Sequence, residues 1–221
     1  NYLSHCDLLR TADVIIPLAA IVGTTACDQD TVAAITTNTQ AIKALYHSVS
    51  HDQLILFPNT NSGYGIGGAV ACTEDSPLNP ISLYGRTKAQ AEEIILEHSN
   101  SISFRFATLF GASPRMRLDL LINNFVYRAV RDHALTLFEG GFRRNYLHVR
   151  DAAGVFLFAI EHLLKQRVFN VGLSNANLTK RELCAKIQEF IPDFVWNEAT
   201  VGEDPDKRDY SVSNARIEAT G

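Results

Sequence analysis

The segment QLILFP at residues 53–58 is a short, almost entirely apolar run, and it decides the fold of this chain. Such a run is typical of a parallel strand that is buried on both faces of a sheet. A second run, ADVIIPLAA, lies upstream at residues 12–20. Downstream, residues 102–106 are rich in β-branched and aromatic side chains, which predicts a third strand.

Two helices are predicted between these strands. Residues 31–49 have the period of an amphipathic helix, and residues 82–98 predict a helix that is opened by Pro80. Strand–helix–strand–helix–strand order predicts right-handed crossovers and a doubly wound parallel sheet. The predicted fold class is therefore α/β.

The pattern becomes less regular after residue 110. A polar loop at 111–117 precedes predicted helices at 118–131, 151–164 and 179–190 and predicted strands at 134–138, 145–149 and 168–171. Asp151 is expected to be an N-cap, and Thr179 with Glu182 matches a capping box. We expect a partial dinucleotide-binding domain at 1–110 and a small α+β, mainly substrate-binding region at 111–221, interleaved with it.

Composition is that of an ordinary globular protein, with 46% hydrophobic and 20% charged residues. A net charge of -4 gives no reason to expect nucleic acid or an anionic membrane as partner. The apolar stretch at residues 14–22 is too short to span a bilayer. The four cysteines lack C-x-x-C spacing, which favours reduced thiols in a cytoplasmic protein; the alternative is a disulfide pair. They are Cys6, Cys27, Cys72 and Cys184.

Tyr84 and Lys88 are the sharpest chemical signal. They lie four residues apart on a predicted helix, and therefore on one face of it. A phenol is a poor base near neutral pH, but a nearby ammonium favours the phenolate and lowers its pKa. The pair can thus serve as an acid and base. The alternative is a surface Tyr and Lys on an amphipathic helix.

A polar stretch, FPNTNSGYG at residues 57–65, follows the central strand. Ligands bind at the carboxyl ends of strands in open α/β sheets, so Thr60 is placed to hydrogen-bond the same substrate oxygen as Tyr84. The alternative is a polar, glycine-rich turn.

Together these motifs resemble the extended short-chain dehydrogenase/reductase superfamily, in particular its nucleotide-sugar epimerase/dehydratase family. The resemblance rests on LAA at 18–20, Asn38, the stretch from Thr60 to Gly65, and Tyr-Gly-x-x-Lys at 84–88. It continues in RFATLFG at 105–111 and GFRRNYLHVRD at 141–151.

The resemblance implies a Rossmann-like fold, NAD as cofactor with NADP left open, a nucleotide-sugar substrate and a homodimer. It also implies roles for individual residues. Tyr84, Lys88 and Thr60 would be catalytic; Ala19, Ala20 and Asn38 would line the cofactor together with Tyr84 and Lys88; Asn61, Ser62, Thr108, Arg144 and Arg208 would contact the substrate.

Three departures from the family pattern matter. The sequence contains no Gly-x-x-Gly-x-x-Gly turn, so we expect that the start of the dinucleotide-binding domain is missing; the alternative is a degenerate family member. We expect weak or absent cofactor binding. A sheet without its first strands exposes a strand edge, so we also expect a tendency to self-associate. Asn61 and Ser62 stand where the dehydratase branch has Asp and Glu, and neither can act as a carboxylate acid or base. Thr108 replaces the family's usual Asn.

These features predict an epimerase-type reaction: a sugar hydroxyl is oxidised and the keto-sugar is then reduced again. The alternatives are a reductase or dehydrogenase of another small alcohol or carbonyl, and a truncated, non-catalytic remnant that binds a partner.

His47 and His51 lack further ligands for a metal site. The charge run at residues 204–209 predicts a solvated loop, with the alternative that Arg208 reaches the substrate phosphates.

Overall fold

A four-stranded parallel sheet forms the centre of the computed structural model, which describes residues 6–203 and 206–221. Its order is β1-β2-β3-β7, with Ile55 of β2 opposite Ser101 of β3 and Thr60 opposite Phe106. The strands are β1 (Val14–Ile15), β2 (Leu54–Thr60), β3 (Ser101–Phe106) and β7 (Val168–Val171). Every residue of β3 is buried, as expected of a central parallel strand. The predicted α/β class is confirmed.

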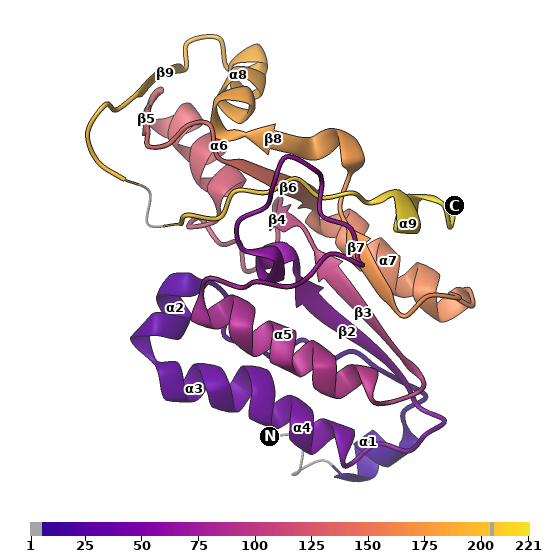
Figure 1. Ribbon diagram of the computed structural model, residues 1–221. Helices are drawn as coiled ribbons and strands as arrows, with labels where there is room; N and C mark the ends of the chain where they lie inside the picture. Colours follow the sequence, from indigo (N-terminus) through magenta and orange to yellow (C-terminus); the bar gives the residue numbers. More distant parts are fainter. Residues whose placement is uncertain (1–5, 204–205) are drawn as a thin grey trace.

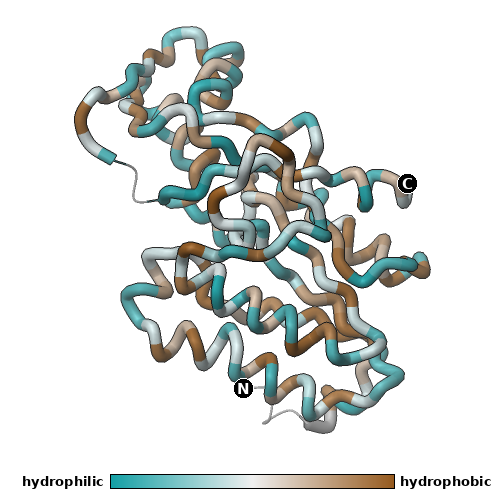
Figure 2. The backbone as a smooth tube through the Cα atoms, viewed as in Figure 1, coloured by the Kyte–Doolittle hydropathy of each residue, from teal (hydrophilic) through white to brown (hydrophobic). Residues whose placement is uncertain are grey.

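Helices cover both faces of this sheet (Figure 1). On one face, Ile55 and Phe57 of β2 pack against α4 (Ala41–Tyr46) and α5 (Leu83–Leu96). On the other face, Leu56 and the aromatic residues of β3 pack against α7 (Val149–Glu161). Figure 2 shows hydrophobic residues along the central strands and α7, in agreement with a core between the layers.

A second, smaller core lies beyond the sheet. It contains α6 (Leu121–Arg131), α8 (Lys180–Phe190) and β5 (Ala134–Leu137), which pairs with β9 (Val195–Glu198). A three-stranded sheet joins it to the centre: β4 (Thr108–Phe110), β6 (Arg143–His148) and β8 (Asn177–Thr179). The remaining helical segments are α1 (Cys6–Thr11), α2 (Thr24–Gln29), α3 (Thr31–Ile35), η2 (Thr36–Gln40), η3 (Asn61–Tyr64), η4 (Ser174–Ala176) and α9 (Ala215–Glu218).

The chain passes between these two parts more than once. β7, from the C-terminal half, pairs with β3, and residues 209–212 return to pair with the loop after β2 through Ile66–Asp209 and Cys72–Val212 bridges. The division at residue 110 stays a prediction. Among the described helices, none has the length and apolar character needed to cross a membrane.

Several local predictions were wrong. The strand predicted at 12–20 contains only Val14–Ile15, because Pro17 offers no backbone N–H and the chain turns out of the sheet there. The predicted helix at 31–49 ends at Tyr46 and contains the π-helical segment η2. The N-cap of α7 is His148, whose side chain accepts from the Arg150 N–H. Asp151 lies in the first turn instead.

The charge run near residue 206 is also different from the predicted solvated loop. Asp204 lies outside the described residues, but Asp206 and Arg208 are half-buried and packed against the rest of the chain. The capping box of Thr179 and Glu182 at α8 is confirmed. Cys27, Cys72 and Cys184 carry free, buried thiols, whereas the side chain of Cys6 lies outside the described part.

Candidate active site

The first turn of α5 is pressed against the carboxyl end of β2. Ser82 caps the helix by accepting the Gly85 N–H at 3.1 Å. A Cβ at Gly85 would lie 2.9 Å from both Pro80 Cβ and the Ser62 carbonyl oxygen, so only glycine permits this approach. The close contact places Tyr84 and Thr60 in the wall of the same pocket, and the Thr60 hydroxyl acts on the pKa of the phenol.

Thr60 organises the residues that follow it. Its hydroxyl accepts the Ser62 N–H at 3.1 Å, which caps η3, and donates to Ser62 Oγ at 3.0 Å. Thr60, Ser62, Tyr84 and Lys88 all line one pocket of about 270 Å³. The proposed catalytic side chains therefore face a common space at the carboxyl end of the sheet, where ligands bind in this fold class.

Lys88 projects one turn further along the same face of α5. Its side chain is buried, with Nζ 4.0 Å from the centroid of the Phe57 ring. None of the hydrogen bonds found in the described part of the chain involves Nζ. Burial lowers the pKa of Lys88 to about 7, against the opposing charge of Glu92. A ligand that accepts hydrogen bonds from Nζ would offset part of the free-energy cost of burying this amine.

Tyr84 is half-buried, and the pKa of its phenol is raised. Burial raises the pKa of the phenol above its usual value, while the interaction with Thr60 and the charge of Arg208 act to lower it. Burial is the largest effect, so without a ligand the phenol stays protonated near neutral pH. A bound group that orders Lys88 close to the phenol would shift this balance toward the phenolate.

The loop after β1 forms another wall of the pocket. Ala20 and Leu18 line it, whereas Ala19 does not. Asn38, in the π-helical segment η2, is buried beneath this loop: Oδ1 accepts the Ile21 N–H at 2.8 Å, and Nδ2 donates to the Ile21 carbonyl oxygen at 2.9 Å. Asn38 thus contacts the back of the loop, away from the pocket that was expected to hold the cofactor.

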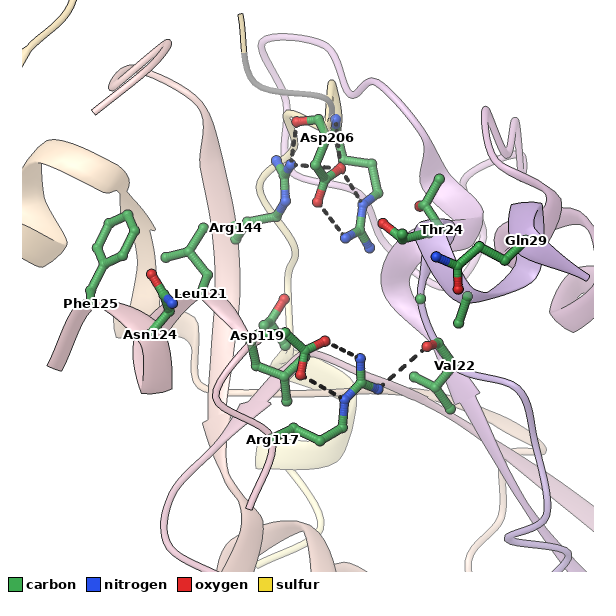
Figure 3. A pocket seen from close by; sticks show the side chains of 16 residues that line it. Val22, Thr24, Gln29, Arg117, Asp119, Leu121, Asn124, Phe125, Arg144 and Asp206 are labelled. Atoms are coloured by element: carbon green, nitrogen blue, oxygen red, sulfur yellow. Dashed lines mark hydrogen bonds and ion pairs between the residues drawn. The ribbon is translucent and has the colours of Figure 1, made fainter. Parts of the chain in front are cut away.

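A larger cleft of about 570 Å³ opens beside the first pocket, and the two share Thr108, Arg117 and Arg208 as walls. In this cleft, Asp206 lies between two arginines (Figure 3): Arg144 Nη2 is 3.2 Å from Asp206 Oδ1, and Arg208 Nη2 is 2.5 Å from Oδ2. Burial works to raise the pKa of Asp206, but hydrogen bonds and charges from Arg208, together with the charge of Arg144, hold it well below its usual range.

Arg208 also ties the cleft to the first pocket. Its Nη1 donates to Ser62 Oγ, next to Thr60. Arg144 is almost fully buried and lies over the Tyr210 ring, with its guanidinium carbon 5.6 Å from the centroid. A planar guanidinium with a fixed orientation is suited to bind phosphate oxygens in pairs.

The cleft contains residues that the sequence did not single out. Figure 3 shows Arg117 facing Asp119, with Nη2 to Oδ2 at 2.5 Å, and reaching Val22 across the cleft, with Nη1 to the carbonyl oxygen at 3.4 Å. Leu121, Asn124 and Phe125 of α6 form a further wall. The Arg-x-Asp spacing at 117–119 in the polar loop is the one signal that could have indicated this pair.

The expected site residues thus fall into three groups. Thr60, Ser62, Tyr84, Lys88, Thr108, Arg208 and Ala20 line the 270 Å³ pocket; Arg144 lines the larger cleft; Ala19, Asn38 and Asn61 line neither. Asn61 is buried within η3, and its amide has no hydrogen-bond partner in the described structure. In residues 6–203 and 206–221, no group of His, Cys, Asp or Glu is arranged to hold a metal ion.

Comparison with solved structures supports this fold. The chain is similar to a dTDP-glucose 4,6-dehydratase from Streptomyces venezuelae with a TM-score of 0.81 at 22% identity, covering 99% of this chain and 70% of that one. It is similar to a UDP-glucuronic acid 4-epimerase from Bacillus cereus with a TM-score of 0.80 at 24% identity, covering 97% and 70%. At these identities the likeness concerns the fold.

Sequence comparison gives relatives of greater length. A UDP-glucose 4-epimerase of Lactobacillus helveticus is 29% identical over 158 residues, which are 60% of this chain and 48% of the relative. An uncharacterised UDP-glucose epimerase of Bacillus subtilis is 28% identical over 210 residues, covering 88% of this chain and 62% of the relative. The chain therefore spans less than two thirds of the length of these two curated relatives.

The match to a family model is the most direct of these results. The model describes the NAD dependent epimerase/dehydratase family, and it matches residues 6–172, which include β2, α5 and the whole Tyr84–Lys88 motif. This match agrees with the parallel sheet and with the placement of the pocket at its carboxyl end. The chain belongs to the NAD dependent epimerase/dehydratase family.

Proposed function

We propose that this chain carries the acid–base and substrate-binding residues of an NAD-dependent, epimerase-type oxidoreduction of a nucleotide sugar. One observation carries the proposal: Tyr84, Thr60 and Lys88 line a pocket that shares walls with a cleft containing Arg144 and Arg208. The pocket suits a sugar ring, and the arginines suit the diphosphate of its nucleotide.

The residues present fit the nicotinamide-ribose end of NAD. Lys88 is a buried ammonium in a pocket wall whose other members include Leu18, Ala20 and Phe106. It would donate to ribose hydroxyl groups, while the apolar residues would exclude water from the ring. When bound, NAD supplies the acceptor and donor of hydride.

The chain's own residues manage the proton. Tyr84 Oη accepts the proton of the reacting sugar hydroxyl and later returns it, and Thr60 hydrogen-bonds to Tyr84 and holds the phenol at the end of β2. Lys88 favours the phenolate by its charge. Arg144 and Arg208 would hold the diphosphate and leave the sugar free to turn within the pocket and present its other face, which inversion of the carbon requires.

Asn61 and Ser62 favour an epimerase over a 4,6-dehydratase. Elimination of water needs acid and base groups beyond Tyr84, and these two positions carry an amide and a hydroxyl. Ser62 is moreover engaged by Thr60 and Arg208.

Product analysis tests the proposal. The chain is incubated with NAD and, in turn, UDP-glucose, UDP-glucuronic acid and dTDP-glucose, with Tyr84→Phe as the control. An epimerase forms the epimer without net change in reduced nicotinamide; net oxidation or reduction of the cofactor would favour a dehydrogenase of another alcohol.

The second candidate is a chain that binds a partner without catalysis. The absence of a Gly-x-x-Gly-x-x-Gly turn from the 221 residues favours it, since that turn holds the pyrophosphate in dinucleotide-binding folds. A fluorescence titration with NADH separates the two. Micromolar binding supports the catalytic proposal, and no binding at millimolar cofactor contradicts it for the chain by itself.

A further inference from the structure

Glu92 is a buried carboxylate that the proposed mechanism does not use. It follows Lys88 by four residues on α5, as Lys88 follows Tyr84, so the three side chains lie along one side of the helix. The side chain of Glu92 is 4% exposed and faces β2 and β3. Burying a carboxylate costs free energy unless it is paired and hydrogen-bonded.

Donors from two strands surround the Glu92 carboxylate. Asn59 Nδ2 and Ser103 Oγ each donate to Oε2 at 2.6 Å, and Arg105 Nη2 donates to Oε1 at 2.6 Å. Burial works to raise the pKa of Glu92, but the bonds and charge of Arg105, with those from Ser103 and Asn59, lower it below its usual value. Glu92 is therefore a fixed negative charge.

Arg105 donates to this carboxylate from Nε as well as from Nη2, whereas its remaining nitrogen, Nη1, has other partners. Its Nη1 donates to Tyr64 Oη at 2.9 Å and to the Glu74 carbonyl oxygen at 3.1 Å, on the side of the sheet end. In this ion pair the guanidinium comes from β3. The carboxylate comes from α5, the helix that also carries Lys88.

The protonated form of Lys88 is stabilised by a nearby negative charge such as that of Glu92. Its Nζ contacts the Phe57 ring, and no hydrogen bond of the described chain satisfies it. Burial lowers the pKa of Lys88 to about 7, and Glu92 is the charge that opposes this effect. With Glu92 in place, the charged and neutral forms of Lys88 are then almost balanced near neutral pH, and loss of the Glu92 charge would leave the neutral form dominant.

We propose that Glu92 is a positioning residue for the acid–base pair: its carboxylate, fixed by Asn59, Ser103 and Arg105, raises the fraction of Lys88 that carries a charge. The catalytic meaning of this inference rests on the proposed function. Without Glu92, Lys88 is a neutral amine near pH 7 and can no longer favour the phenolate of Tyr84.

Other charged groups near Lys88 have partners of their own. Arg117 and Arg208 line the same pocket but are paired with Asp119 and Asp206. Tyr84 on α5 and Tyr210 on the C-terminal segment are the titratable phenols of the pocket. β2 contributes the uncharged Asn59 and Thr60. Glu92 is the group whose charge opposes the effect of burial on the pKa of Lys88.

The protonation of Lys88 can be measured without cofactor or turnover. The folded chain is labelled with trace acetic anhydride over a range of pH, and acetylation of Lys88 is quantified by peptide mass spectrometry against the exposed Lys186. The variants are Glu92→Gln, Glu92→Asp and, as matched control, Glu93→Gln, whose side chain is exposed on the same helix.

We expect Glu92→Gln to lower the pKa of Lys88 by about one unit, as the loss of a charge one helical turn away implies. Glu92→Asp should largely restore it, and Glu93→Gln should leave it unchanged. An unchanged pKa in folded Glu92→Gln would overturn the inference. Since no cofactor is involved, a failed NADH titration would contradict the proposed function and leave this result intact.

Glu92→Gln leaves Arg105 without its buried partner and can prevent folding. The double variant Glu92→Gln/Arg105→Gln removes both charges of the pair and serves in its place. It should lower the pKa of Lys88 in the same direction, and an unchanged value there would equally overturn the inference.

Discussion

Asn38 satisfies both polar backbone groups of Ile21, accepting its N–H at 2.8 Å and donating to its carbonyl oxygen at 2.9 Å. The side-chain amide thus replaces the neighbouring strand that this segment lacks after Pro17. Its Nδ2 also donates to Thr87 Oγ1 at 3.2 Å, on α5 between Tyr84 and Lys88. One residue of a π-helical segment therefore joins the pocket wall to the proposed catalytic helix, and such segments are frequent at functional sites.

Asn38→Asp should destabilise the chain by about 1–3 kcal/mol, because a carboxylate cannot donate to the Ile21 carbonyl oxygen and leaves it unpaired. Urea unfolding measures the change. Gln40→Ala is the matched control, since Gln40 is exposed in the same segment. If both variants unfolded at the same urea concentration, the bonds to Ile21 would not matter for stability.

The central strands and the helix α5 could be predicted from the sequence because local pattern and burial agree there. QLILFP is apolar on both faces, and β2 is buried on both faces. The short β1 could not be predicted, since residues 18–22 stay apolar although the chain has left the sheet there and lines a pocket. Hydrophobicity alone does not distinguish these two environments.

The candidate site could be predicted from the sequence where its residues lie on a single helix or strand. Tyr84 and Lys88 share a helix, so their spacing predicts their common face. Asp206 with Arg144 depends on contact between segments 62 residues apart, and local spacing contains no trace of it. The charge run therefore predicts a solvated loop, although its half-buried Arg208 donates to Asp206 and Ser62.

Tyr84 should ionise above the usual pKa of about 10 for a tyrosine in the ligand-free chain. Burial penalises the phenolate, and this outweighs the hydrogen bond of Thr60 and the charge of Arg208. The difference in ultraviolet absorbance between wild type and Tyr84→Phe, followed from neutral to alkaline pH, isolates this phenol. A midpoint below that of free tyrosine would mean that the positive charges dominate even without a ligand.

Asp206 should make stability depend on acid pH. Its folded-state pKa lies below the unfolded value of about 4, so its contribution is present above pH 4 and is lost as pH falls through the folded value. Asp206→Asn should therefore lower stability near neutral pH, and its difference from wild type should narrow in acid. Urea midpoints across this range test it, with the surface variant Asp132→Asn as control; a constant difference would contradict the prediction.

Arg117, which lines both pockets, should hold the loop after β1 in place. Its guanidinium pairs with Asp119 and donates to the Val22 carbonyl oxygen, which connects the loop before α6 to the loop after β1. Arg117→Met keeps much of the side-chain volume and removes every donor. Amide hydrogen exchange in residues 21–25 should become faster, because the contact that holds Val22 is gone.

Arg115→Met is the matched control, because Arg115 lies in the same loop but is exposed. It should leave exchange in residues 21–25 unchanged. In a calorimetric titration with UDP-glucose, loss of the charged donors of Arg117 should weaken binding about tenfold, the equivalent of one charge-assisted hydrogen bond. Faster exchange with unaltered binding would mean that Arg117 holds the loop without contacting the ligand. Unaltered exchange would mean that Asn38 alone is sufficient to hold Ile21 and Val22 in place.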